Sequence, residues 1–488
     1  MALSCCLMSQ ALAQVVVTPS ISTKATYTDG RSTSANSDGE FLVEVTPRIS
    51  LRENQGFLTG SMDASLKNIK YFNDSSRSTS FVAFRGEGHF EAVEDVFFID
   101  ASGSVSRNDR SAFASRSESD SLNTSASNET RFFSIAPRLQ FHLGNFADGR
   151  LQYSSTWNSG GSKAVSAQRV GQLSLNLDNR RNSGPLGWFA GYDRVTTKYD
   201  GDIRDVTREV ARIGPTYRLT PQFTLRASVG RESNDYASSG TRSDNTYGFG
   251  FDWVPTIRTS LSAFSEERIF GRGYDVRFKH RMRRSQFNLS FSRSFSSSTN
   301  VVQKSLEDYY YDLIYSSLTG IEDEAQRDAL TRILLVQLGL DGASGQIGFV
   351  SNAQVLTRQF RAGWSITGVR NTLTVSYDQR ESENQSTDLI LSGLDDFAIS
   401  RQIKSKSMIV SLAHRLSGFT SLNTSLSRTR SEGSGSAGRE QQNTGFSLGL
   451  TRRLGAKTNG GLTYTHTKRT GDFARDTNTL TATLGIRF

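Results

Sequence analysis

Segment after segment of this sequence alternates between apolar and polar residues. In residues 41–51 (FLVEVTPRISL) the odd positions carry apolar side chains and the even positions mostly polar ones. The same alternation returns at 132–143, 223–230, 247–253 and 286–292. A period of two residues is typical of a β-strand whose two faces meet different media. The chain is therefore expected to consist mainly of strands.

The length of these segments favours a membrane barrel over a soluble sandwich. Most of them are about twice as long as the five or six residues typical of soluble strands, and no other part of the chain could cover their apolar faces. Only 36% of the residues are hydrophobic and no run of about 18 apolar residues could form a spanning helix. A disordered polar chain is excluded by 30 Phe and 15 Tyr residues that fall in phase. A closed barrel places the apolar face in lipid and the polar face in a wet lumen.

The alternation predicts an all-β fold: a transmembrane antiparallel outer-membrane β-barrel of about 22 strands, filling residues 14–488 as one domain. An even strand number puts both ends in the periplasm. Connections are expected to alternate strictly between short periplasmic turns and long external loops rich in Ser, Asn, Asp and Gly. Short turns are expected at 54–56, 92–94, 220–221, 417–418 and 454–455, and long loops at 108–128, 235–242 and 385–398.

Residues 1–13 (MALSCCLMSQALA) are interpreted as a truncated signal peptide, with Ala11-Leu12-Ala13 as the cleavage signal. The alternative is a buried first strand. Cys5 and Cys6 both lie in this segment, so the mature chain would have no thiol for a disulfide, a zinc site or catalysis.

The last ten residues, TLTATLGIRF, place Leu484, Ile486 and Phe488 on one apolar face, with an aromatic residue at the carboxyl terminus. This pattern resembles the terminal strand that the barrel assembly machinery recognises. The alternative is an ordinary half-buried strand.

Three prolines, Pro47, Pro137 and Pro215, lie on the apolar face of their segments, six or seven residues before a short turn. Proline cannot donate to a sheet ladder, so a bulge or a water molecule is expected to replace the missing bond near the inner interface.

Residues 301–345 break the strand pattern with helical spacing and are expected to form an acidic helical insert in an extracellular loop. The insert is either a solvated cap or a constriction that folds into the mouth. The residues expected to face a constriction are Leu306, Tyr309, Tyr310, Leu313, Leu330 and Leu334.

The chain carries a formal net charge of +9. Its outer-membrane partners are expected to be lipid, anionic lipopolysaccharide and an anionic polysaccharide, and not nucleic acid. The cations expected to line the lumen are Arg48, Arg52, Arg138, Arg212, Arg218, Arg226, Arg277, Lys279 and Arg380. Such a lining would favour anionic solutes. The alternative is that these residues pair with carboxylates across the lumen and stabilise the barrel.

Signals for an enzyme are weak. The five histidines show no metal-ligand spacing, and no phosphate loop or nucleophile elbow is present, so no cofactor and no catalytic residue is predicted. A hydrolase embedded in a barrel stays a minor alternative. A TonB-type transporter is not expected, because strands begin almost at the cleavage site.

The opening VTPSISTKATYTDG, the strand VTPRISL and the segment GSMDASLKNIKYFND resemble the outer-membrane proteins associated with the PEP-CTERM/exosortase system of Gram-negative bacteria. The resemblance extends to the insert and the closing strand. It implies a role in surface-polysaccharide traffic or protein sorting and supplies no catalytic residues. The predicted function is a pore or conduit for exopolysaccharide export, and the alternative is a surface barrel that displays loops to protein or glycan partners.

Overall fold

The computed structural model describes residues 15–29, 39–53, 56–109, 111–113, 127–160, 167–179, 184–201, 204–236, 240–297, 351, 353–386, 395–435, 438–471 and 474–488. The expected signal peptide and the expected insert at 301–345 lie outside these residues.

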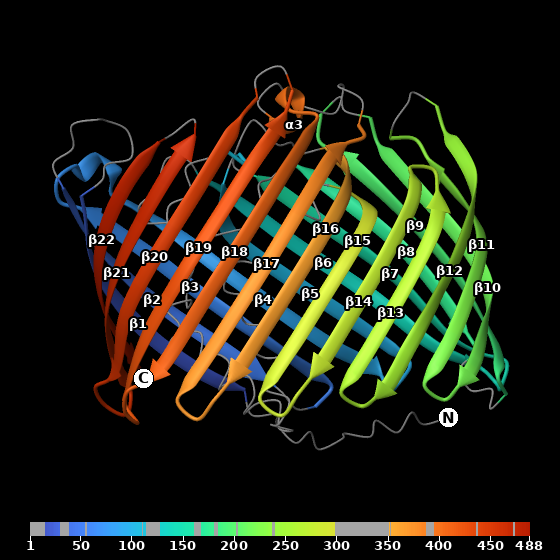
Figure 1. Ribbon diagram of the computed structural model, residues 1–488, viewed down its shortest axis with the longest axis horizontal. Helices are drawn as coiled ribbons and strands as arrows, with labels where there is room; N and C mark the ends of the chain where they lie inside the picture. The colour runs from blue at the N-terminus through green and yellow to red at the C-terminus, as the bar shows by residue number, and fades with distance from the viewer. Residues whose placement is uncertain are drawn as a thin grey trace, which may run out of the picture.

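The described residues form one 22-stranded sheet (Figure 1). The strands are β1 Val16–Thr28, β2 Glu40–Glu53, β3 Leu58–Tyr71, β4 Thr79–Val93, β5 Phe97–Asp109, β6 Ser127–Leu143, β7 Ala147–Gly160, β8 Gln168–Asp178, β9 Leu186–Tyr199, β10 Val206–Thr220, β11 Phe223–Asn234, β12 Arg242–Thr256, β13 Thr259–Arg268, β14 Gly271–Arg281, β15 Ser285–Ser297, β16 Gln354–Thr367, β17 Asn371–Asn384, β18 Gln402–Arg415, β19 Thr420–Ser434, β20 Glu440–Arg453, β21 Thr458–Gly471 and β22 Arg475–Arg487. Two short helical turns accompany them: η1 Ser75–Arg77 and α3 Asp396–Ile399.

The sheet closes on itself. Each strand pairs antiparallel with the next, and β22 returns to β1 in a register that places Ile486 opposite Ile21 and Leu480 opposite Tyr27. The expected fold class, an antiparallel outer-membrane barrel, is confirmed. Closure leaves no sheet edge that would expose unpaired backbone groups to lipid. None of the helices in the described part of the chain is long and apolar enough to cross a membrane.

The two faces of the barrel wall differ as the alternation predicts. Large apolar side chains such as Phe249 and Leu426 stand exposed on the outer face, at 59% and 51%. Along the strands, polar residues alternate with such apolar residues and face inward. Two of these polar residues, Glu232 on β11 and Thr246 on β12, are almost fully buried. Residues opposite each other in an antiparallel pair share a face. The register therefore assigns every paired strand residue to the outer or the inner face.

The two ends of the barrel carry different connections. Even-to-odd connections are short, down to the two residues between β10 and β11, and β1 begins and β22 ends at that same end (Figure 1). Outer-membrane barrels have short periplasmic turns and longer external loops, so this end is periplasmic. The expectation of strict alternation is wrong at external hairpins such as β13–β14 and β21–β22, where β22 begins four positions after β21 ends. Only Ile269 and Phe270 join β13 to β14, and Gly271, with a φ of 88°, permits the tight turn.

The three prolines sit at interruptions of the ladder, and the expected bulge is absent from these described sites. Pairing skips the proline and the residue before it: β2 loses Thr46 and Pro47 against β3, β6 loses Pro137 against β7, and β10 loses Pro215 against β11. The register is the same on both sides of each gap. Each proline therefore turns its missing N–H toward the following strand, and the sheet tolerates the lost bond without an inserted residue.

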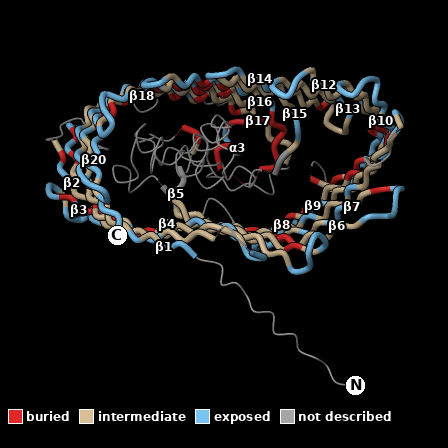
Figure 2. Tube along the Cα trace, turned by 90° about the horizontal axis from the view of Figure 1, so that it is seen from below, coloured by how far each residue is buried: buried red, intermediate tan, exposed pale blue. Residues whose placement is uncertain are grey.

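Seen from below, the wall forms a flattened ring (Figure 2). Strands β4 and β5 lie on one long side, β16 and β17 lie on the other, and α3 lies inside the ring. This flattening brings the external ends of opposite walls close enough for contacts between them.

Candidate gate and charged lining of the barrel interior

The nine predicted cations all lie in the inward-facing phase of their strands. Arg48 is opposite Ser20, and Arg226 is opposite Gly250, whose strand neighbour Phe249 is exposed to the outside. The same register argument places the other seven, on β2, β6, β10, β14 and β17, on the inner face. Most of these cations, including Arg52, Arg138 and Arg277, lie in the half of the strand nearer the periplasmic turns.

Several of these cations pair with carboxylates along the wall rather than across the interior. The ion-pair distances are 3.8 Å for Arg52–Asp63, 3.9 Å for Arg138–Asp100, 2.7 Å for Arg226–Asp252 and 3.0 Å for Arg277–Asp275. The partners lie on adjacent strands or on the same strand. The cations and carboxylates therefore form a mixed but predominantly basic lining. Arg218 and Lys279 are exposed, and Arg380 lies near Asp378 and Arg361.

A more deeply buried charge network lines the wall at β10, β11 and β13. Arg268 donates to both carboxylate oxygens of Glu232, at 2.6 and 2.9 Å, and Glu232 is fully buried. Arg212 makes the same two-bond contact with Glu266, at 2.5 and 2.8 Å. Arg268 lies 3.6 Å from Glu266 and so joins the two pairs. Two-bond Arg–carboxylate contacts fix side-chain geometry, so this network fixes the side chains that line the inner face from β10 to β13.

The external end of β16 is buried on both faces, although its residues stay paired with β15 and β17 in the sheet. In an ordinary barrel strand every second residue faces lipid, but residues 351 and 353–357 are all buried. These residues are called the mouth bar below. One side of the mouth bar faces β9: Gln354 donates a hydrogen bond to the hydroxyl of Tyr199 at 2.9 Å.

The other side of the mouth bar packs on α3. Ser351 donates to both carboxylate oxygens of Asp395, at 3.0 and 2.7 Å, and the backbone N–H of Phe397 donates to Asp395 at 2.9 Å. Asp395 is thus the N-cap of the single helical turn and anchors it to the bar at the same time.

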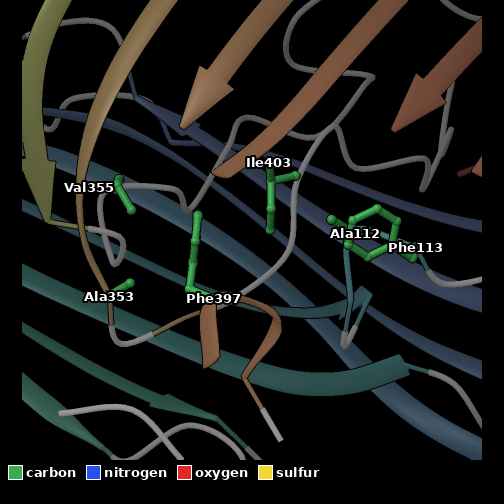
Figure 3. Packing of buried hydrophobic residues seen from close by; sticks show 6 residues of the cluster. All are labelled: Ala112, Phe113, Ala353, Val355, Phe397 and Ile403. Carbon is green, nitrogen blue, oxygen red and sulfur yellow. The ribbon is translucent and has the colours of Figure 1, made fainter. Parts of the chain in front are cut away.

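Residues 111–113, which follow β5 on the opposite wall, reach α3 from across the interior. The Ser111 hydroxyl and the Ala112 N–H donate to the two oxygens of Asp396, at 2.8 and 2.6 Å. Phe113 is fully buried and joins Ala353, Val355, Phe397 and Ile403 in one apolar cluster. In Figure 3, Phe397 lies between the Ala353–Val355 pair and the Ala112–Phe113 pair.

Arg439, from the loop before β20, completes this contact. Its guanidinium lies 3.3 Å from Asp396 and 4.7 Å from the centre of the Phe113 ring. Burial raises the pKa of Asp396 above its ordinary value, against the opposing effects of the Ala112 and Ser111 hydrogen bonds and of Arg439. The carboxyl is held by three donors and is still costly to ionise.

A second aromatic contact joins the external ends of β15 and β11. The rings of Tyr236 and Phe295 stack at 4.2 Å, beside Tyr199 and Val206. Burial raises the pKa of Tyr236 to about 12, and nearby Glu232 adds to the effect. These contacts and those of the mouth bar connect opposite walls at the external end of the barrel. The name mouth contact is used below for the whole set, which comprises residues 111–113, the mouth bar, α3, Arg439, and the Tyr199, Tyr236 and Phe295 side chains.

The predicted constriction residues Leu306, Tyr309, Tyr310, Leu313, Leu330 and Leu334 lie outside the described residues. The constriction that the structure describes is built from residues 111–113, the mouth bar and α3, none of which was predicted. The sequence held one weak signal for α3, an Asp-Asp-Phe stretch at 395–397 that could cap a helix.

The remaining predicted positions are placed as follows. Leu484 and Ile486 face outward on β22, and the backbone N–H of Phe488 donates to Pro19 on β1 at 2.9 Å. Among the described residues, no group of three or more His, Cys, Asp or Glu side chains could hold a metal ion.

No protein-family model and no curated protein matches the sequence. Among solved structures, the chain is similar to the FrpB iron transporter from Neisseria meningitidis (F5-1 variant), with a TM-score of 0.50 and 11% identity over 96% of this chain and 82% of that one. The siderophore receptor PirA from Pseudomonas aeruginosa gives a TM-score of 0.43 at 10% identity, covering 97% and 80% of the two chains. A loop L8 deletion mutant of OmpT, an outer membrane protein of Vibrio cholerae, gives 0.35 at 8% identity, covering 97% and 99%.

At these identities the similarity concerns the fold alone. The fold is that of a Gram-negative outer-membrane barrel, and the apolar outer face with its polar inner face fits no other medium. The protein is an outer-membrane barrel.

Proposed function

We propose that this protein is a gated conduit of the outer membrane for an anionic polymer or solute. The observation that carries the proposal is the division of the interior into two zones. A basic lining occupies the periplasmic half, and the mouth contact at the external end is made by loops and strand ends. Loop contacts can part without breaking the ladder of the barrel, so the mouth can open while the wall stays closed.

The lining supports an anionic permeant. Fixed charges of one sign in a narrow, water-filled interior raise the local concentration of ions of the opposite sign. Pairing reduces the effect at Arg52, Arg138, Arg226 and Arg277, whose carboxylate partners are close. The exposed Arg218 and Lys279 supply cationic groups near the periplasmic end.

The finer role that we propose is the export of exopolysaccharide or another surface polymer in an exosortase-type system. Its support is the resemblance to the PEP-CTERM/exosortase-associated family at the VTPSISTKATYTDG and VTPRISL segments. The resemblance implies a polysaccharide and the basic lining favours an anion, so the permeant that we propose is an acidic polysaccharide. Lipopolysaccharide and the barrel assembly machinery are the other partners that we expect.

The conduit is tested by locking the mouth with a disulfide. We expect a Ser111→Cys/Asp396→Cys double variant to conduct little in planar bilayers when oxidised and to conduct more after reduction. The Ser111 hydroxyl and a carboxylate oxygen of Asp396 are 2.8 Å apart, so the two residues are in direct contact. Thiol labelling before the recording checks that the disulfide has formed. The single variant Ser111→Cys is the control, because it should not respond to reductant. Equal conductance of the oxidised and reduced double variant would argue against a gate at this contact.

A surface barrel that displays its loops is the second candidate. The interlocking of the mouth bar, α3 and residues 111–113 favours it, because a mouth that stays closed would hold external loops in a fixed arrangement. Absence of conductance in the wild type and in both cysteine variants, oxidised and reduced, would select this function over the conduit.

A further inference from the structure

The outer face of β18–β21 changes abruptly from apolar to basic toward the external end of the barrel. Met408, Leu426, Phe446 and Tyr464 stand exposed there and mark the upper part of the apolar belt. Just above them, Lys406, Arg428 and Lys468 occupy outward-facing positions on β18, β19 and β21. These three residues are called the rim cations. The strands are seen at the front left of Figure 1.

The register brings the rim cations together. Arg428 and Lys468 lie on either side of Thr444, each directly opposite it. Lys406 is opposite Arg430, which makes it a diagonal neighbour of Arg428. With strands about 4.8 Å apart, the rim cations span about 15 Å along the wall. That span is comparable in size to one lipid headgroup rather than to a long polymer.

The rim cations differ from three other outward-facing cations, Arg194, Lys198 and Arg272, each of which has a carboxylate partner. On the other side of the barrel, Arg194 lies 3.2 Å from Glu209, Lys198 lies 3.7 Å from Asp205, and Arg272 lies 3.8 Å from Glu267. In the described part of the chain, none of the three rim cations is within 4.0 Å of a carboxylate.

The charged groups around the rim cations do not cancel them. Arg430 is shared between Glu432 and Glu440, at 2.7 and 2.9 Å, so these carboxylates are already engaged one level higher. Asp476 stands opposite Lys468 in the register without pairing with it. The neutral Gln442 accepts a hydrogen bond from Arg428 at 3.0 Å and holds its guanidinium over the apolar belt.

A cation at this height meets the headgroups of the outer leaflet. Aromatic residues such as Phe446 and Tyr464 mark the membrane interface of barrels. In the register, Arg428 and Lys468 lie one outward position beyond the row of Leu426, Phe446 and His466. The outer leaflet of a Gram-negative bacterium presents phosphorylated glycolipid there. Arginine and lysine bind phosphate oxygens through charge-assisted hydrogen bonds.

We propose that the rim cations, Lys406, Arg428 and Lys468, form a binding site for the phosphorylated headgroup of an outer-leaflet glycolipid. The acyl chains of the lipid lie along Met408, Leu426 and Phe446, and Thr444 lies between the two cations of its row. The site is on the outside of the wall and is independent of whether the barrel conducts.

The test is the binding of lipid A to the purified full chain in detergent, followed by native mass spectrometry. Wild type is expected to bind phosphorylated lipid A, and the K406Q/R428Q/K468Q triple variant is expected to bind it on the order of 100-fold more weakly, since each cation near a membrane surface contributes about a factor of five. The matched control is R194Q/K198Q/R272Q, which removes the same charge from the paired cations and should leave binding unchanged.

A second arm keeps the test valid if the triple variant fails to fold. Wild type should bind dephosphorylated lipid A at least tenfold more weakly than the phosphorylated form, because the proposed contacts are to phosphate. Equal binding of the two lipids would overturn the proposal. So would a folded triple variant, judged by heat-dependent gel mobility, that binds phosphorylated lipid A within about threefold of wild type.

Discussion

Gln354, at the external end of β16, donates a hydrogen bond to the hydroxyl of Tyr199 on the opposite wall, at 2.9 Å, with both side chains buried. The contact joins residues 155 positions apart and lies where a permeating molecule would leave the barrel. Opening of the mouth would therefore have to break this hydrogen bond.

We expect Gln354→Ala to increase the open probability of the barrel in planar bilayers about tenfold. The substitution removes the Gln354–Tyr199 hydrogen bond from the closed state, which costs that state up to about 1.5 kcal/mol. The matched control is Gln359→Ala on the same strand, because the Gln359 amide bonds Asp378 on the adjacent strand instead of the opposite wall. An unchanged open probability in Gln354→Ala would show that this bond does not hold the mouth closed.

The closed mouth is expected to weaken as pH rises. Burial raises the folded-state pKa of Asp396 above its ordinary value of 3.8, so the docked α3 binds a proton more tightly than the undocked one. The docked state is therefore favoured most below that ordinary value and loses stability as pH rises toward the raised value. Hydrogen exchange of the α3 amides between about pH 4 and about pH 7, corrected for intrinsic rates, should reveal the change.

Asp396→Asn is expected to remove this pH dependence, since an amide does not titrate. Asp205→Asn, which removes an exposed carboxylate from another external loop, should retain it. A pH response that persists in Asp396→Asn would assign the effect to another group.

The wall of the barrel could be predicted from the sequence because the information is local. Most residues in FLVEVTPRISL indicate their face by their own polarity, and closure needs only the repetition of that pattern. Leu42 is the exception, since it is apolar and fully buried on the inner face. The inward phase of Arg48 and the outward phase of Leu484 follow in the same way. The β13–β14 connection departs from the expected long external loop because Gly271, with a φ of 88°, permits a two-residue turn.

The mouth could not be predicted, because its contacts are not local. Ser111 and Asp396 are 285 positions apart, and nothing in either segment indicates the other. The helical turn α3 has only four residues, too few for a periodic signal. The outward phase of Pro47 could be predicted from the alternation. The sequence did not show that Pro47 points its missing N–H toward the following strand, where the ladder tolerates the gap without a bulge.

Gly214→Ala is expected to destabilise the barrel by about 1–3 kcal/mol, because an added Cβ would collide with the backbone carbonyl oxygen of Ala227 on β11. The collision is with backbone, so no side-chain rotation relieves it. The temperature at which heat-dependent gel mobility changes measures the effect. Gly485→Ala is the control, since an added Cβ there meets no atom within 4 Å. Equal transition temperatures for the two variants would mean that β10 and β11 can separate at this point at little cost.

Removing Arg268 is expected to cost about 3–5 kcal/mol, because it leaves Glu232 ionised and fully buried without its two-bond partner. Arg277→Ala provides the contrast: its pair with Asp275 is largely exposed, at 66% and 39%, and should contribute at most about 1 kcal/mol. The comparison is made with the same gel-mobility transition in urea. Adding Glu232→Gln to Arg268→Ala should recover much of the loss, since the neutral amide no longer needs a countercharge. If the double variant is no more stable than Arg268→Ala, the loss comes from the packing of Arg268 against Phe270 and not from the stranded carboxylate.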